Sequence, residues 1–165
     1  MASRWRADPL DWEGRDMRFV FALGAMALAG CSMLAPEMTP VQEVEAHMKG
    51  YTEAWNKHDA AEIAKNFYRL GPTVEDQTKS LEKSFADLKA RGYDHSDIYE
   101  IKGCITGPDT AWAAMKFSRL KTDGAPLQAN LASAYNLTKF PDGWRITKMG
   151  AGGATFDKPL ECPKG

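Results

Sequence analysis

The sequence is poor in cysteine and histidine, the residues that most often bind transition metals. It contains three cysteines and three histidines in 165 residues. The cysteines lie far apart, and no two histidines have the short spacing typical of metal ligands, so we expect no metal site. A glycine-rich phosphate loop between a strand and a helix is also missing, because no helix follows the glycine cluster at residues 150–153. We therefore expect no cofactor.

Charge of one sign is also lacking. The 21 Lys and Arg residues are balanced by 22 Asp and Glu residues, the formal net charge is -1, and the basic residues form no run. This pattern argues against nucleic acid as a partner, since nucleic-acid binding normally requires a basic surface. The 44% of hydrophobic residues suffice for one core, and the chain is short for two domains. We expect one globular domain.

No hydrophobic run is long enough to span a membrane. The longest extends from Phe19 to Gly30, about a dozen residues, whereas a membrane-spanning helix needs about twenty. It follows Met17 and Arg18 and ends in small residues, which is the order of a secretory signal peptide. We therefore expect residues 1–30 to be a signal peptide. Residues 1–16 contain both acidic and basic side chains, which is unusual for the start of a signal peptide. This favours Met17 as the true first residue.

The run ends in Leu28-Ala29-Gly30-Cys31, which resembles the lipobox of bacterial lipoproteins. The resemblance implies cleavage before Cys31 and attachment of lipid to its thiol, so that the partner is a membrane. Ser32 in place of aspartate implies an outer-membrane lipoprotein that faces the periplasm, with residues 31–38 as a lipidated tether. The other interpretation is a buried N-terminal helix that contains a cysteine.

Helix signals dominate the first half of the remaining chain. Thr39 as N-cap, Pro40 and Gln42 predict a helix start, and an apolar stripe continues it through Tyr51 and Trp55. Asp59 predicts a second N-cap three residues before Glu62. A third helix is predicted from a Ser80 cap to Gly92, preceded by a short strand at residues 73–76.

Turn signals divide the second half into segments of strand length. They lie at residues 107–109, 122–124 and 141–143. Helices followed by consecutive hairpins predict an α+β fold, with the helices on one face of a curved antiparallel sheet. The four predicted strands are 97–106, 110–121, 127–140 and 144–150.

These elements and several motifs resemble the nuclear transport factor two-like superfamily, which includes SnoaL-like polyketide cyclases and ketosteroid isomerase. The motifs are residues 51–56, 67–68, 73–76 and 140–146. The resemblance implies a cone in which three helices pack on a strongly curved antiparallel sheet and the open end forms a pocket. We expect this domain at residues 39–153, with a C-terminal tail at residues 154–165.

The resemblance to ketosteroid isomerase also implies site residues. Tyr51 corresponds to the oxyanion-hole tyrosine and Asp76 to the general base. Asn136 stands where that enzyme has a protonated aspartate, and an amide has no proton to exchange. The plainer interpretations are a core aromatic for Tyr51 and a strand-end turn residue for Asp76. The further pocket residues that we expect are Trp55, Phe67, His95, Tyr135 and Asn136.

Two classes of function are consistent with this site. One is a noncatalytic module that binds a small apolar molecule or another protein at the membrane. The other is an isomerase, cyclase or dehydratase acting on an apolar ring, with Asp76 moving a proton and Tyr51 stabilising negative charge. Asn136 favours the first class. A homodimer formed through the outer face of the sheet, around Trp112, is compatible with both.

Cys104 and Cys162 remain after Cys31 is assigned to lipidation. In an oxidising compartment they could form a disulfide that pins the tail to the sheet. Two free buried thiols are the other possibility, since a bridge requires Cα atoms within roughly 7 Å. The sequence leaves both open.

Overall fold

The computed structural model describes residues 37–164, so the predicted signal peptide, Cys31 and most of the tether lie outside the described residues. The helices are α1 (Pro40–Asn56), α2 (Ala60–Glu62) continuing into η1 (Ile63–Phe67), and α3 (Val74–Ala90). The strands are β1 (Tyr93–Gly107), β2 (Thr110–Lys121), β3 (Pro126–Phe140) and β4 (Gly143–Met149). They form one antiparallel sheet in the order β1-β2-β3-β4. The predicted α+β class is confirmed.

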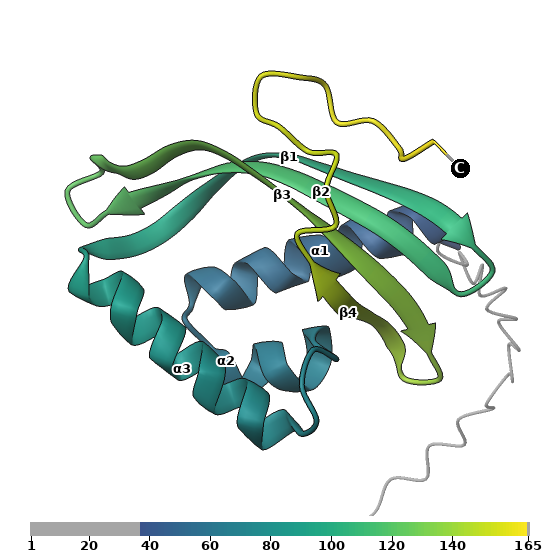
Figure 1. Ribbon diagram of the computed structural model, residues 1–165, viewed down its shortest axis with the longest axis horizontal. Helices are drawn as coiled ribbons and strands as arrows, with labels where there is room; N and C mark the ends of the chain where they lie inside the picture. Colours follow the sequence, from purple (N-terminus) through teal and green to yellow (C-terminus); the bar gives the residue numbers. More distant parts are fainter. Residues whose placement is uncertain (1–36, 165) are drawn as a thin grey trace, which may run out of the picture. The chain divides into compact units, whose positions relative to one another are not determined.

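The helices cover the inner, concave face of the sheet, and the C-terminal tail crosses its outer face (Figure 1). Within the described residues, no helix is long and apolar enough to cross a bilayer. The core lies between α1 and the inner face, where Val44, Met48 and Ile146 are fully buried. A cavity in this fold can therefore form only where the helices and the inner face do not fill the space between them.

Helix α1 starts as its sequence predicts. The Thr39 side chain accepts a hydrogen bond from the Gln42 backbone N–H at 3.3 Å, and the Gln42 side chain accepts one from the Thr39 N–H at 2.8 Å. This reciprocal pair is a capping box, which satisfies two backbone donors at the helix start. Further along the helix, Tyr51 lies on the buried side of α1 with Val44 and Met48 and packs in the core against the inner face.

The second helical segment ends in a π-helical turn. Asp59 caps its start by accepting from the Glu62 N–H at 2.9 Å, as predicted. At its end, the Tyr68 N–H donates to the Ile63 carbonyl at 3.1 Å, an i to i+5 bond. The chain then joins the sheet, because the Arg69 N–H donates to the Ile146 carbonyl at 2.9 Å. The turn and this bond together place Tyr68 against β4.

The third helix begins earlier than the sequence predicts. Residues 73–76 form no strand, and Ser80 is not a cap, because α3 begins at Val74 with Thr73 as its N-cap. The Thr73 hydroxyl accepts from the Asp76 N–H at 3.0 Å and donates to the Asp76 carboxylate at 2.6 Å. Buried Gln77 then accepts from the Leu70 N–H at 2.9 Å. These local bonds outweigh the β propensity of Thr73 and Val74.

The four strands match the predicted segments closely: the first begins four residues earlier, at Tyr93 instead of Asp97, and every other boundary lies within one residue of its prediction. Strand β2 is buried almost throughout, because both of its faces are covered. Its inward residues, such as Ala113, Met115 and Phe117, join the main core. Its outward residues Trp112 and Ala114 join a second cluster, which Leu160 of the tail completes.

A disulfide holds the tail in place. Cys104 of β1 and Cys162 are bonded, with their Cα atoms 5.7 Å apart. Of the two alternatives that the sequence leaves open, the structure therefore has the bridge. Trp112, which the sequence places in a homodimer interface, is 4% exposed because the tail of its own chain covers it.

Candidate functional site

A small chamber lies between the C-terminal half of α1 and the inner face of the sheet. Its volume is about 60 Å³, whereas a cavity of about 150 Å³ is known to bind benzene. Tyr51, Thr52, Trp55 and Asn56 form its helical wall. The residues that the sheet contributes are Ser96, Ile98, Met115, Phe117, Arg119, Ser133, Tyr135 and Met149.

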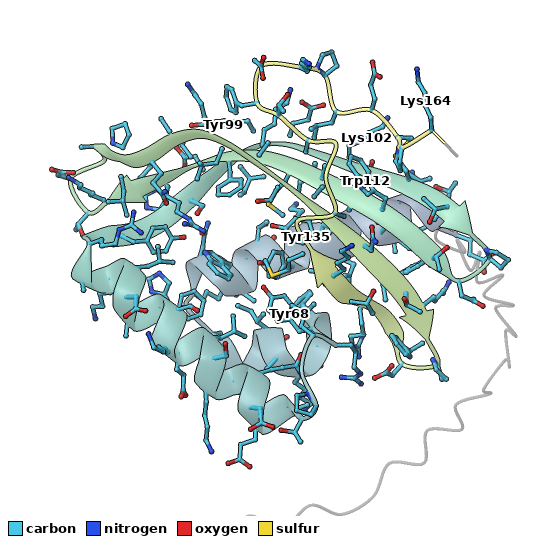
Figure 2. The ribbon with its side chains drawn as sticks, viewed as in Figure 1. Tyr68, Tyr99, Lys102, Trp112, Tyr135 and Lys164 are labelled. Atoms are coloured by element: carbon cyan, nitrogen blue, oxygen red, sulfur yellow. A yellow bond between two sulfur atoms is a disulfide. The ribbon has the colours of Figure 1, made fainter. Side chains whose placement is uncertain are left out.

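A chain of hydroxyl groups borders the chamber. The Tyr51 and Tyr68 hydroxyls are 2.9 Å apart, and the Tyr68 hydroxyl donates to the Met149 sulfur at 3.7 Å. Either hydroxyl can donate in the bond between Tyr51 and Tyr68, so the two phenols share one hydrogen bond. Tyr135 packs against Tyr51 with ring centroids 5.9 Å apart. Figure 2 shows Tyr68 and Tyr135 between the sheet and the helices.

The tyrosines that border the chamber are neutral at physiological pH. Burial is the main cause that raises the pKa of Tyr51 well above its usual value, and burial likewise raises the pKa of Tyr68 and of Tyr135. A buried phenolate would lack the solvation that water gives it. These groups can therefore donate or accept hydrogen bonds, but they do not exchange protons near pH 7.

An open groove adjoins the chamber. It has a volume of about 380 Å³ and runs along the N-terminal half of α3. Trp55 and Met149 line both spaces, so these two side chains form the partition between them. Met149 is 44% exposed and flexible by nature, and a shift of its side chain would join the groove to the chamber.

The predicted general base lies in the groove and not in the chamber. Asp76 is exposed in the first turn of α3, where it takes part in the N-cap with Thr73. It lines the groove together with Tyr68. The structure thus separates Asp76 from Tyr51, which faces the chamber, and corrects its predicted place at the end of a strand.

Asn136 lies on the opposite side of the sheet from Tyr51. Side chains alternate between the two faces of a strand, and its neighbours Tyr135 and Leu137 belong to the inner core. Asn136 is exposed and borders a groove on the outer face beside Trp112. The prediction that Asn136 faces Tyr51 across the pocket is therefore wrong, because the alternation of β3 turns it outward.

Of the remaining predicted pocket residues, only Trp55 and Tyr135 line a cavity. Trp55 and Tyr135 line the chamber, whereas Phe67 is buried behind Tyr51, with ring centroids 6.1 Å apart. His95 lies away from both cavities. Its Nδ1 is 2.7 Å from the Asp94 carboxylate, and its side chain is 39% exposed.

Most of the residues that line the chamber were not predicted from the sequence, and Arg119 and Met149 are the two that matter most for its chemistry. Arg119 and Met149 both line the chamber. Arg119 could have been found from the two-residue period of β2, because Met115 and Phe117 precede it on the same face. Nothing in the sequence marks Met149, since its position depends on how β4 ends beside Tyr68.

This arrangement of helices, curved sheet and inner chamber defines an NTF2-like α+β cone. A family model described as an NTF2-like protein, DUF6841, matches residues 42–153, and the chain belongs to this family. The comparison with curated proteins gave no match.

Solved structures with a similar fold include an NTF2-like protein with a cystatin-like fold from Novosphingobium aromaticivorans. Its identity is 16% and its TM-score 0.49, over 65% of this chain and 77% of that one. Another comes from Streptomyces avermitilis and is provisionally described as a dehydratase of the NTF2-like family. Its identity is 15% and its TM-score 0.49, over 66% of this chain and 91% of that one. Similarity at this level does not carry a function from one protein to another.

Proposed function

We propose that this protein is an envelope lipoprotein whose NTF2-like domain binds a small apolar molecule without catalysing a reaction. The observation that carries the proposal is the pair of adjoining cavities, an aromatic chamber and a larger groove that share Trp55 and Met149. Concave, mostly apolar sites with a few polar groups are typical of small-molecule binding. The groove supplies room for the body of a ligand, and the chamber supplies room for one small group.

The composition of the chamber favours binding over catalysis. Among the described residues that line it, none is an aspartate, glutamate or histidine. Acid–base catalysis requires a group that exchanges protons near the working pH, and the pKa of Tyr51 is raised well above its usual value, mainly by burial. The Tyr51 hydroxyl is also hydrogen-bonded to the Tyr68 hydroxyl at 2.9 Å, so it is already engaged within the fold.

One observation keeps the enzymatic alternative testable. Asp76 and Tyr68 line the same groove, so a substrate bound there could touch both a carboxylate and a phenol. An isomerase, cyclase or dehydratase of the ketosteroid isomerase or SnoaL-like kind would use Asp76 to move a proton. The two proposals differ in what Asp76 does once a ligand is bound.

A ligand panel separates the two proposals. We expect neutral ring compounds to quench Trp55 fluorescence and to bind the purified protein and its Asp76→Asn variant with dissociation constants within about threefold of each other. The reason is that the amide introduced by Asp76→Asn keeps an acceptor for the Thr73 hydroxyl, so the groove is unchanged in shape. Tryptophan fluorescence and calorimetry measure the binding. Conversion of a ring compound by the wild type that Asp76→Asn abolishes would contradict the noncatalytic proposal, and absence of binding by every compound would contradict both.

Membrane attachment is tested through Cys31. We expect radiolabelled palmitate to enter the protein in a bacterial host and Cys31→Ser to remove the label, because acylation requires the thiol at the end of the lipobox. The wild type should fractionate with the outer membrane, since several acyl chains on one residue hold a protein far better than one. Cys104→Ser is a matched control that should keep the label. Equal labelling of wild type and Cys31→Ser would exclude this anchor.

A further inference from the structure

Arg119 brings a positive charge into the chamber without a carboxylate partner. It lies on β2 and points inward beside Phe117, with its guanidinium carbon 5.8 Å from the centre of that ring. Gln128, its neighbour across the β2–β3 ladder, accepts from Nη1 at 2.8 Å. Within residues 37–164, no aspartate or glutamate forms an ion pair with Arg119 or lines the chamber.

The free edge of the guanidinium is the one suited to a carboxylate. Arg119 Nε is buried and has no hydrogen-bond partner among the described residues. Nε and Nη2 form one edge of the planar group, and this edge matches the two oxygens of a carboxylate. A buried donor without a partner costs free energy, which a bound anion would recover. The Gln128 bond uses Nη1 on the other side of the guanidinium and leaves Nε and Nη2 without a hydrogen-bond partner among the described residues.

The residues around Arg119 suit a ligand that has an anionic head group and an apolar body. Ser133 and Tyr135 line the chamber with Arg119, and both carry hydroxyls that can donate to an anion. The chamber, at about 60 Å³, admits a head group and little more. The groove beyond Met149 has about 380 Å³ for the rest of the molecule. A negatively charged head would meet one positive charge and neutral hydroxyls there.

We propose that the site recognises a monocarboxylate with an apolar body, whose carboxylate pairs with Arg119 in the chamber while the body lies in the groove past Trp55 and Met149. This inference rests on the proposed binding function and specifies its ligand class. Arg119 is then the residue that distinguishes an acid from a neutral molecule of the same shape.

The test compares 3-phenylpropionate with 3-phenylpropionamide, which has nearly the same shape and no charge. At pH 7.4 we expect the wild-type protein to bind the carboxylate at least tenfold more tightly than the amide. Arg119→Gln should bind the two compounds equally, at the wild-type affinity for the amide, and Arg119→Lys should keep part of the preference. Arg69→Gln is the matched control, because Arg69 pairs with Asp142 outside both cavities, and it should behave as the wild type.

The outcomes separate this inference from the proposed function. Equal wild-type affinity for acid and amide overturns the role of Arg119 and leaves the binding function intact. A preference for the acid that survives in Arg119→Gln also overturns it. If the wild type binds neither these compounds nor neutral rings, the proposed function fails as well. Should Arg119→Gln fail to fold, the wild-type comparison and Arg119→Lys still decide the question.

Discussion

Replacing Cys162 with serine is expected to lower the free energy of unfolding by about 2–4 kcal/mol. The Cys104–Cys162 bridge joins residues 58 positions apart, and a loop of that length restricts the unfolded chain by an amount that corresponds to about 4 kcal/mol at 25 °C. Cys162 itself is exposed, so the serine adds no buried polar group at that position. Chemical denaturation under non-reducing conditions measures the difference.

The bridge also holds the tail over the outer face of the sheet. Leu160 packs there with Trp112, Ala114 and Ala134, and Phe156 packs edge-on against Tyr99 with ring centroids 5.9 Å apart. In Cys162→Ser we expect this cover to loosen, the Trp112 emission to shift to the red, and the exposed face to associate with a second copy. The tail thus covers, within one chain, the surface that a dimer would bury.

A reducing agent provides the matched control for this experiment. Adding it should destabilise the wild type and leave Cys162→Ser unchanged, so that the two unfolding curves coincide. Analytical ultracentrifugation of the same samples reports whether loosening of the tail promotes dimers. An unchanged denaturation midpoint in the non-reduced variant would show that the bridge does not stabilise the fold.

Local signals account for most of the fold that the sequence predicts. Thr39, Asp59 and the three turn segments act through hydrogen bonds and backbone preferences within a few residues of themselves. Such signals act in the same way in any tertiary context. The helices and strands therefore lie where the sequence predicts them. The start of α3 is the exception: Thr73 and Asp76 form a local N-cap there, but the β propensity of Thr73 and Val74 favours a strand at the same residues.

The site was harder to predict because it depends on which face of a strand is turned inward. Tyr135 and Asn136 are neighbours in sequence, yet one borders the chamber and the other faces outward. The outer face of β2 and β3 is itself apolar where the tail covers it, so polarity alone does not distinguish the two faces. The correspondence with ketosteroid isomerase therefore placed Asn136 on the wrong side of the sheet.

The surroundings of His47 were likewise not predicted by the sequence. The sequence pattern of α1 predicts His47 on the polar side of the helix, but the structure packs it against Phe67 with ring centroids 4.9 Å apart. Its Nε2 is buried and has no partner among the described residues. Burial, together with repulsion from the nearby Arg145 guanidinium, lowers the pKa of His47 from 6.5 to about 4.

This histidine is expected to make the fold sensitive to mild acid. A folded-state pKa below that of the unfolded chain means that the unfolded chain binds the proton first as the pH falls. The contribution of neutral His47 to the free energy of unfolding is fully present above pH 6.5. It is lost as the pH falls from 6.5 to about 4, and it changes no further below that range. The full shift corresponds to about 3 kcal/mol, and the partial exposure of the ring reduces the expected loss to about 2 kcal/mol.

The measurement is urea denaturation of wild type and His47→Gln at half-unit steps from pH 7 to pH 4. Carboxylates titrate in both proteins, so the difference between the two curves isolates His47. We expect the wild type to lose about 2 kcal/mol more than His47→Gln over this range. His95→Gln, which replaces a half-exposed histidine beside Asp94, controls for the loss of a histidine elsewhere in the fold. Parallel curves for wild type and His47→Gln would show that the His47 ring is protonated equally easily in the folded and unfolded chains.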